Sequence, residues 1–135
     1  MCGNAYEASF ANSLPGKFTI LIDDGPHTLD SQKSFVELYL PKLANDGVLI
    51  IEDVQRAYRD SYQLMSLAPA NKYRFEVYDF RGISGAGDDF LFVVRHNKAG
   101  RKQIALRAYV TIRCLVSYLA APFRRIARMS LWRGK

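Results

Sequence analysis

Two short, uninterrupted apolar runs constrain the fold of this chain more than any other feature. They span Phe18–Ile22 and Val48–Ile51, and neither alternates apolar with polar residues. Runs of this kind are typical of strands that are covered on both faces in a parallel sheet. The sequence therefore predicts an α/β fold in which both segments are buried strands.

Two further strands and two helices are expected around these runs. The strands cover Tyr73–Phe80 and Phe90–Val94, and the helices cover residues 29–43 and 58–67. The order strand, helix, strand, helix, strand, strand predicts parallel βαβ units for the first three strands. The Gly-rich loop 81–88 is too short for a crossover helix, so the last two strands should pair antiparallel at one sheet edge. The predicted sheet has three parallel strands plus an antiparallel edge strand.

Breaking residues mark the ends of both predicted helices. Pro41 lies late in the first helix and should kink it or begin a separate last turn. The turn Asn45-Asp46-Gly47 then supplies the stop signal. Pro69 ends the second helix in the same way.

Charge divides the chain into two parts. Residues 1–94 hold 8 Lys/Arg and 13 Asp/Glu, whereas residues 95–135 hold 11 Lys/Arg and no acidic residue. We therefore predict a globular domain at 1–97, followed by a basic, amphipathic helical tail at 98–135. The tail, rather than the domain, calls for an anionic partner.

The partner of the tail stays open between two alternatives. The stretch Ile104–Phe123 is largely apolar, but Arg107 and Arg113 within it would be costly inside a bilayer. A helix lying on an anionic membrane surface fits residues 104–133 better. Packing of its apolar stripe on the domain or on a protein partner fits equally well. A nucleic-acid role is not expected, because no recognised nucleic-acid-binding fold is present.

The cysteines and the N-terminus bear on location. Cys2 and Cys114 are far apart and form neither a disulfide framework nor a zinc pattern, which favours a reducing compartment. The N-terminus lacks the basic start and the following apolar run that mark a signal peptide, so we expect none. We expect a cytoplasmic protein, peripheral at the membrane if the tail binds lipid.

The candidate chemical centre is an acidic turn that follows the first apolar run. It reads Asp23-Asp24-Gly25-Pro26-His27, and Glu52-Asp53 follows the second run. Ligands of open α/β sheets bind beyond the carboxyl ends of the strands, where neighbouring parallel strands would bring these groups together. Two carboxylates can share a hard cation, and a histidine beside them can act as a general base. The alternative is a solvated turn in which His27 only caps a helix.

These motifs together resemble the second half of the class I S-adenosylmethionine-dependent methyltransferases. The chain is most similar to the metal-dependent sugar O-methyltransferases of macrolide biosynthesis and their relatives in polysaccharide clusters. The resemblance covers about residues 3–95 and depends on the segments 18–27, 40–43 and 46–53. It implies a partial Rossmann-like methyltransferase sheet and methylation of a sugar or polysaccharide hydroxyl.

The resemblance also implies roles for individual residues. Asp24 and Asp53 would bind Mg²⁺, and His27 would remove the proton from the acceptor hydroxyl. Asp23 would lie along the side of the strand that faces the cofactor, S-adenosylmethionine. The segment Gly3-Asn4-Ala5 resembles the Gly-Asp-Ala that holds adenine in many such enzymes. Asn4 and Ala5 are therefore expected to contact the cofactor, with the Asn4 amide oxygen as the acceptor.

The sequence departs from the family at its beginning. The opening βαβ half, with its glycine-rich cofactor loop, its ribose-binding acid and a further metal ligand, has no counterpart here. We therefore expect a truncated copy, a gene fragment or a misassigned start, with a site that this chain cannot use unaided. Two other classes stay open. One is a non-catalytic membrane-surface or partner-binding module that works through its tail. The other is a metal-dependent hydrolase that uses the same acidic residues. Only two strand ends supply ligands, which is few for a two-metal site.

Overall fold

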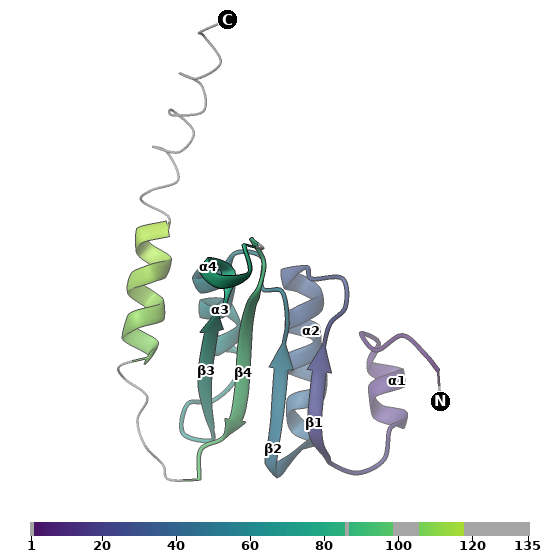
Figure 1. Cartoon of the computed structure of the whole chain (residues 1–135). Coiled ribbons are helices and arrows are strands. Elements are labelled where there is room, and N and C mark those ends of the chain that lie inside the picture. Colours follow the sequence, from purple (N-terminus) through teal and green to yellow (C-terminus); the bar gives the residue numbers. More distant parts are fainter. Residues whose placement is uncertain (1, 86, 99–105, 118–135) are drawn as a thin grey trace, which may run out of the picture.

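A four-stranded mixed sheet forms the centre of the molecule (Figure 1). The computed structural model describes residues 2–85, 87–98 and 106–117 of the chain. The strands lie in the order β1-β2-β4-β3; β1 and β2 are parallel, and β4 is antiparallel to both of its neighbours. Their bounds are β1 Phe18–Asp23, β2 Leu43–Ile51, β3 Tyr73–Asp79 and β4 Phe90–His96.

The prediction of three parallel strands with an antiparallel edge strand is wrong. Only β1 and β2 pair in parallel, and the antiparallel strand β4 lies inside the sheet, between β2 and β3. Burial explains this order: Phe92, Val93 and Val94 of β4 are almost fully buried, whereas β3 carries the more accessible Arg74 and Glu76. The more apolar strand takes the interior position, and the more polar strand takes the edge, where charged side chains are tolerated. The prediction that β3 and β4 pair antiparallel is confirmed.

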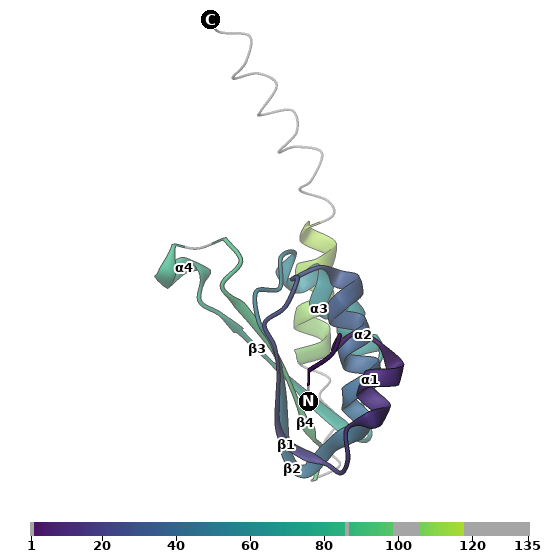
Figure 2. The ribbon, with the colours of Figure 1, turned by 90° about the vertical axis from the view of Figure 1, so that its right-hand side faces the viewer.

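The helices gather on one side of the sheet. Figure 2 shows α1, α2, α3 and the helical residues 106–117 on that side, while α4 lies at the tip of the β3–β4 connection. Fully buried side chains from both layers meet between them, and these include Val36, Leu49, Leu64, Phe75 and Phe92. The helices have the bounds α1 Ala8–Ser13, α2 Leu29–Tyr39, η1 Leu40–Lys42, α3 Ala57–Ser66 and α4 Arg81–Ser84.

Proline ends α2 earlier than the sequence pattern suggested. The helix stops at Tyr39, and Pro41 opens the separate 3-10 turn η1, which confirms the expectation of a separate last turn. The turn Asn45-Asp46-Gly47 was expected to stop the helix, but these residues belong to β2. The second predicted helix is confirmed as α3, one residue earlier at each end.

The expectation that both apolar runs are covered on both faces is wrong for β1. Leu21 and Asp23 point toward the helices and are buried, but Ile20 and Ile22 are 63% and 51% exposed. Helices cover one face of β1 in the described chain, so alternate residues of the apolar run stay accessible. An uninterrupted run therefore identified the strand but not the number of layers around it.

Residues 106–117, within the predicted tail, form a helix beside α3 (Figures 1 and 2). Val110 is fully buried and Cys114 is 7% exposed, so this helix packs on the domain. The remaining tail residues 99–105 and 118–135 lie outside the described residues. Among the described residues, no helix combines the length and the hydropathy that crossing a bilayer requires.

Candidate functional site

The carboxyl ends of β1 and β2 lie side by side, and a short segment follows each strand at the same edge of the sheet. Asp23, the last residue of β1, pairs with Ile51, the last residue of β2. The Glu52 N–H then donates to the Asp23 carbonyl at 3.0 Å, which extends the contact one residue beyond the strands. After β1 the chain turns quickly into α2, because the Thr28 hydroxyl caps that helix by accepting from the Ser31 N–H at 3.1 Å.

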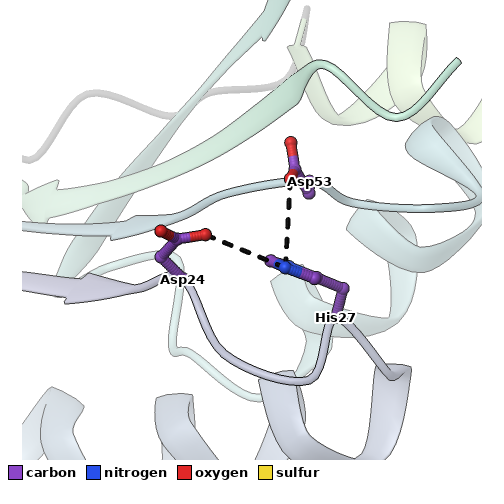
Figure 3. A group of neighbouring side chains, drawn as sticks. All are labelled: Asp24, His27 and Asp53. Atoms are coloured by element: carbon purple, nitrogen blue, oxygen red, sulfur yellow. Dashed lines mark ion pairs between the residues drawn. The ribbon is translucent and has the colours of Figure 1, made fainter. Parts of the chain in front are cut away.

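This arrangement brings Asp24, His27 and Asp53 together, as the sequence predicted (Figure 3). His27 Nε2 lies 3.8 Å from Asp24 Oδ1 and 3.9 Å from Asp53 Oδ2, and the three ligand atoms lie within 4.8 Å of one another. Ligands of one ion at about 2.1 Å are separated by at most about 4.2 Å. The two His27 distances lie below this limit, and the 4.8 Å that bounds the whole group lies slightly above it.

Two members of this group adopt an unusual backbone conformation. His27 has φ +54° and Asp53 has φ +51°, both in the left-handed region that most residues avoid. Histidine and aspartate tolerate this region better than most side chains, but each still costs about 1 kcal/mol relative to glycine. Such strain persists only where the surroundings hold it, and it is frequent at functional sites.

The two ring nitrogens of His27 have different surroundings. Nε2 faces the two carboxylates, whereas Nδ1 is enclosed and has no hydrogen-bond partner among the described residues. The side chain as a whole is 30% exposed, so solvent or a ligand can reach the ring. Nε2 is therefore the nitrogen placed to exchange a proton with a molecule bound at the carboxylates.

Asp23 lies apart from this group and is tied to the N-terminal segment. Asp23 is 5% exposed as a residue, and its carboxylate accepts a hydrogen bond from the Tyr6 hydroxyl. Burial raises the pKa of the Asp23 carboxyl, although the bonds from Tyr6 and from the Gly25 backbone act in the opposite direction. A Cβ at Gly25 would lie 1.8 Å from the Tyr6 oxygen, so only glycine leaves room for this contact.

Sequence reasoning missed Tyr6. Its hydroxyl reaches a carboxylate 17 residues away, and no periodic pattern connects the two positions. Burial, followed by the bond to Asp23, raises the pKa of Tyr6 well above its usual range. Gly25 was visible in the sequence, but only as a turn residue and not as the space that Tyr6 fills.

Asn4, one predicted cofactor contact, takes part in local hydrogen bonds, whereas Ala5, the other, is bonded to α2. Asn4 Oδ1 accepts from the Tyr6 N–H at 3.1 Å, and Asn4 Nδ2 donates to Glu7 at 3.1 Å. The Ala5 carbonyl accepts from the Tyr39 hydroxyl at 2.9 Å. The structure does not bring either residue into the Asp24–His27–Asp53 group, and their contact with a cofactor stays a prediction.

A cavity borders His27 on the helix side of the turn. Its volume is about 590 Å³, within the range of small-molecule sites. The lining comes from the start of α2 and from the segment that precedes α3, and it consists of His27, Thr28, Leu29, Asp30, Gln55 and Arg56. A polar molecule held there would lie next to the imidazole.

Comparisons with protein-family models, with curated proteins and with solved structures found no match for this chain. Interpretation of the site therefore depends on its own geometry and chemistry.

Proposed function

We propose that Asp24, His27 and Asp53 form the metal and base site of an S-adenosylmethionine-dependent O-methyltransferase. The observation that carries the proposal is the convergence of two carboxylates and one imidazole from the ends of two neighbouring parallel strands. These are the residues to which the sequence resemblance gives the same roles. The acceptor class that we propose is a sugar or polysaccharide hydroxyl.

The donor atoms suit a hard divalent cation. Mg²⁺ is typically held by one or two carboxylates and keeps several waters, which substrate oxygens can replace. Asp24 and Asp53 provide the two carboxylates, and their side chains are 67% and 40% exposed, so room for water and substrate remains. A bound Mg²⁺ would supply positive charge that favours ionisation of a neighbouring hydroxyl.

His27 would act as the base in methyl transfer. Its Nε2 would take the proton that the acceptor oxygen gives up as this oxygen replaces sulfur on the methyl carbon. The electron pair of the broken carbon–sulfur bond stays on sulfur, so charge balances. Asp24 and Asp53 lie within 4 Å of Nε2, and their two negative charges would offset the Mg²⁺ charge that otherwise disfavours the imidazolium.

The cavity beside His27 favours a hydroxyl-rich acceptor. Asp30, Gln55 and Arg56 line it and offer donors and acceptors of hydrogen bonds to a polar ligand. A purely apolar acceptor would leave these groups without partners, at a cost in binding.

Calorimetric titration with S-adenosylmethionine in the presence of Mg²⁺ tests the proposal. The titration is run on two proteins. One is the full chain, and the other is the same chain extended at its N-terminus by the residues that the upstream in-frame codons encode. Binding to either protein supports the proposal, and His27→Asn should keep that binding while removing methyl transfer to saccharide acceptors. Absence of heat from both proteins at millimolar cofactor would contradict the proposal.

A further inference from the structure

The helical residues 106–117 carry apolar side chains on two opposite faces. One face packs on the domain through Val110, which is fully buried, and Cys114, which is 7% exposed. The other bears Tyr109, Ile112, Leu115 and Val116, which are between 47% and 58% exposed. We call these four residues the outer stripe. At helical spacing Ile112 and Val116 lie opposite Val110 and Cys114, and Tyr109 and Leu115 lie at the two borders between the faces.

Specific contacts hold this helix in one orientation. The Arg107 guanidinium lies over the Phe75 ring at 5.3 Å, and the Arg113 guanidinium lies over the Tyr58 ring at 4.7 Å. The hydroxyls of Tyr58 and Tyr109 are 3.2 Å apart and share a hydrogen bond. Because the inner face is engaged in this way, the outer stripe is not a loosely packed part of the core.

The apolar surface continues from the outer stripe onto α3. Tyr62 of α3 is 47% exposed and lines the same hollow of about 380 Å³ as Leu115. Two tyrosines, Tyr62 and Tyr109, therefore flank exposed aliphatic side chains. Tyrosine is enriched where one end of a side chain is apolar and the other meets water, as at a membrane interface.

Charge indicates the partner of this surface. Residues 95–135 include 11 Lys/Arg and no Asp or Glu, and five of the basic residues follow the described helix, at positions 124–135. Exposed aliphatic and aromatic side chains within a uniformly basic segment are the combination that binds anionic lipid surfaces. We propose that the outer stripe docks on an anionic lipid bilayer, with the domain held on it through the inner face of the helix.

A second copy of the chain is a poorer partner for the same surface. A contact of stripe against stripe would bring together two segments, residues 95–135 of each copy, that each carry 11 Lys/Arg and no acidic residue to compensate. An anionic bilayer neutralises these charges and covers the aliphatic side chains at the same time.

Co-sedimentation of the full chain with lipid vesicles tests this proposal. We expect binding to vesicles that contain phosphatidylserine, with much weaker binding to vesicles of phosphatidylcholine alone. The double variant Ile112→Asp, Val116→Asp should weaken binding by about tenfold or more, because it removes two apolar contacts and adds repulsion. Ile83→Asp is the matched control, since Ile83 is 86% exposed on α4 and outside the stripe.

Two results would overturn the proposal. One is equal sedimentation of the double variant and the unaltered chain, with circular dichroism showing both to be folded. The other is a dimer in sedimentation equilibrium that the double variant converts to a monomer without change in lipid binding, which would assign the stripe to a second copy. Neither result depends on methyl transfer, so this inference stands or falls separately from the proposed function.

Discussion

Removal of the Tyr6 hydroxyl should destabilise the protein more than removal of the hydroxyl of Tyr39. Both tyrosines tie the N-terminal segment to the body, Tyr6 by donating to the Asp23 carboxylate and Tyr39 by donating to the Ala5 carbonyl at 2.9 Å. Replacement of each by phenylalanine keeps the ring and removes one hydrogen bond. The two variants therefore compare a bond to a charged acceptor with a bond to a neutral one.

The expected difference follows from the burial of Asp23. Asp23 is 5% exposed as a residue, so water replaces the lost donor poorly. A hydrogen bond to a charged group contributes about 1.5–3 kcal/mol, and one between neutral groups about 1 kcal/mol. Tyr6→Phe should therefore lower the free energy of unfolding by about 2 kcal/mol at pH 7, and Tyr39→Phe by about 1 kcal/mol.

The penalty of Tyr6→Phe should depend on pH. The bond from Tyr6 favours the ionised form of Asp23, so its loss raises the pKa of Asp23 in the folded state further above the unfolded value. A raised folded pKa of an acid means that stability falls as pH rises through the unfolded pKa of about 4. The penalty should be small in acid, where Asp23 is protonated, and largest near neutral pH.

Urea unfolding followed by circular dichroism at acidic and neutral pH measures both effects. The reasoning would be refuted if Tyr6→Phe cost no more than Tyr39→Phe at pH 7. It would also be refuted if the penalty of Tyr6→Phe were larger in acid than at neutral pH.

Three further predictions concern other parts of the chain. Because His27 has φ +54°, His27→Gly should be more stable than His27→Ala by about 1 kcal/mol in thermal unfolding. Hydrogen bonds from Arg81 lower the pKa of Asp79 to about 2. Asp79→Asn should therefore cost about 1 kcal/mol at pH 7, after allowance for solvent screening, and this difference should vanish as pH falls from about 4 to about 2. Val110→Ala should lower the free energy of unfolding by about 2 kcal/mol, whereas the exposed Ile112→Ala should change it by less than about 0.5 kcal/mol. Equal effects of these last two variants would contradict packing of residues 106–117 on the domain.

The sequence identified the strands but not their order. Apolar runs and alternation report how much of a strand is buried, and they located β1, β2, β3 and β4. The order depends on which strands are apolar enough to be stabilised by a neighbouring strand on each edge. Finding them requires comparing the burial of all four strands. Phe92, Val93 and Val94 made β4 the more buried strand, but its short connection to β3 suggested an antiparallel pair at the sheet edge.

The proximity of the site residues was predictable because it depends on a single rule: residues that follow neighbouring parallel strands lie at the same edge of the sheet. Asp24, His27 and Asp53 follow strands that pair in parallel, so their proximity came from the β1–β2 contact alone. The rest of the sheet could change order without moving them. The tie between Tyr6 and Asp23 depends instead on how the N-terminal segment returns to the end of β1, for which the sequence carries no periodic signal.

Binding of a divalent cation by Asp24 and Asp53 is the most direct test of the proposed metal site. Mn²⁺ replaces Mg²⁺ at carboxylate sites, and its electron paramagnetic resonance signal weakens when it binds protein. We predict that the full chain binds Mn²⁺ and that Asp24→Asn and Asp53→Asn each weaken binding by about tenfold or more. Asp30→Asn, which alters a carboxylate that lines the cavity but lies outside the group, should leave binding unchanged. Equal Mn²⁺ binding by all four proteins, or none by the unaltered chain, would contradict the account.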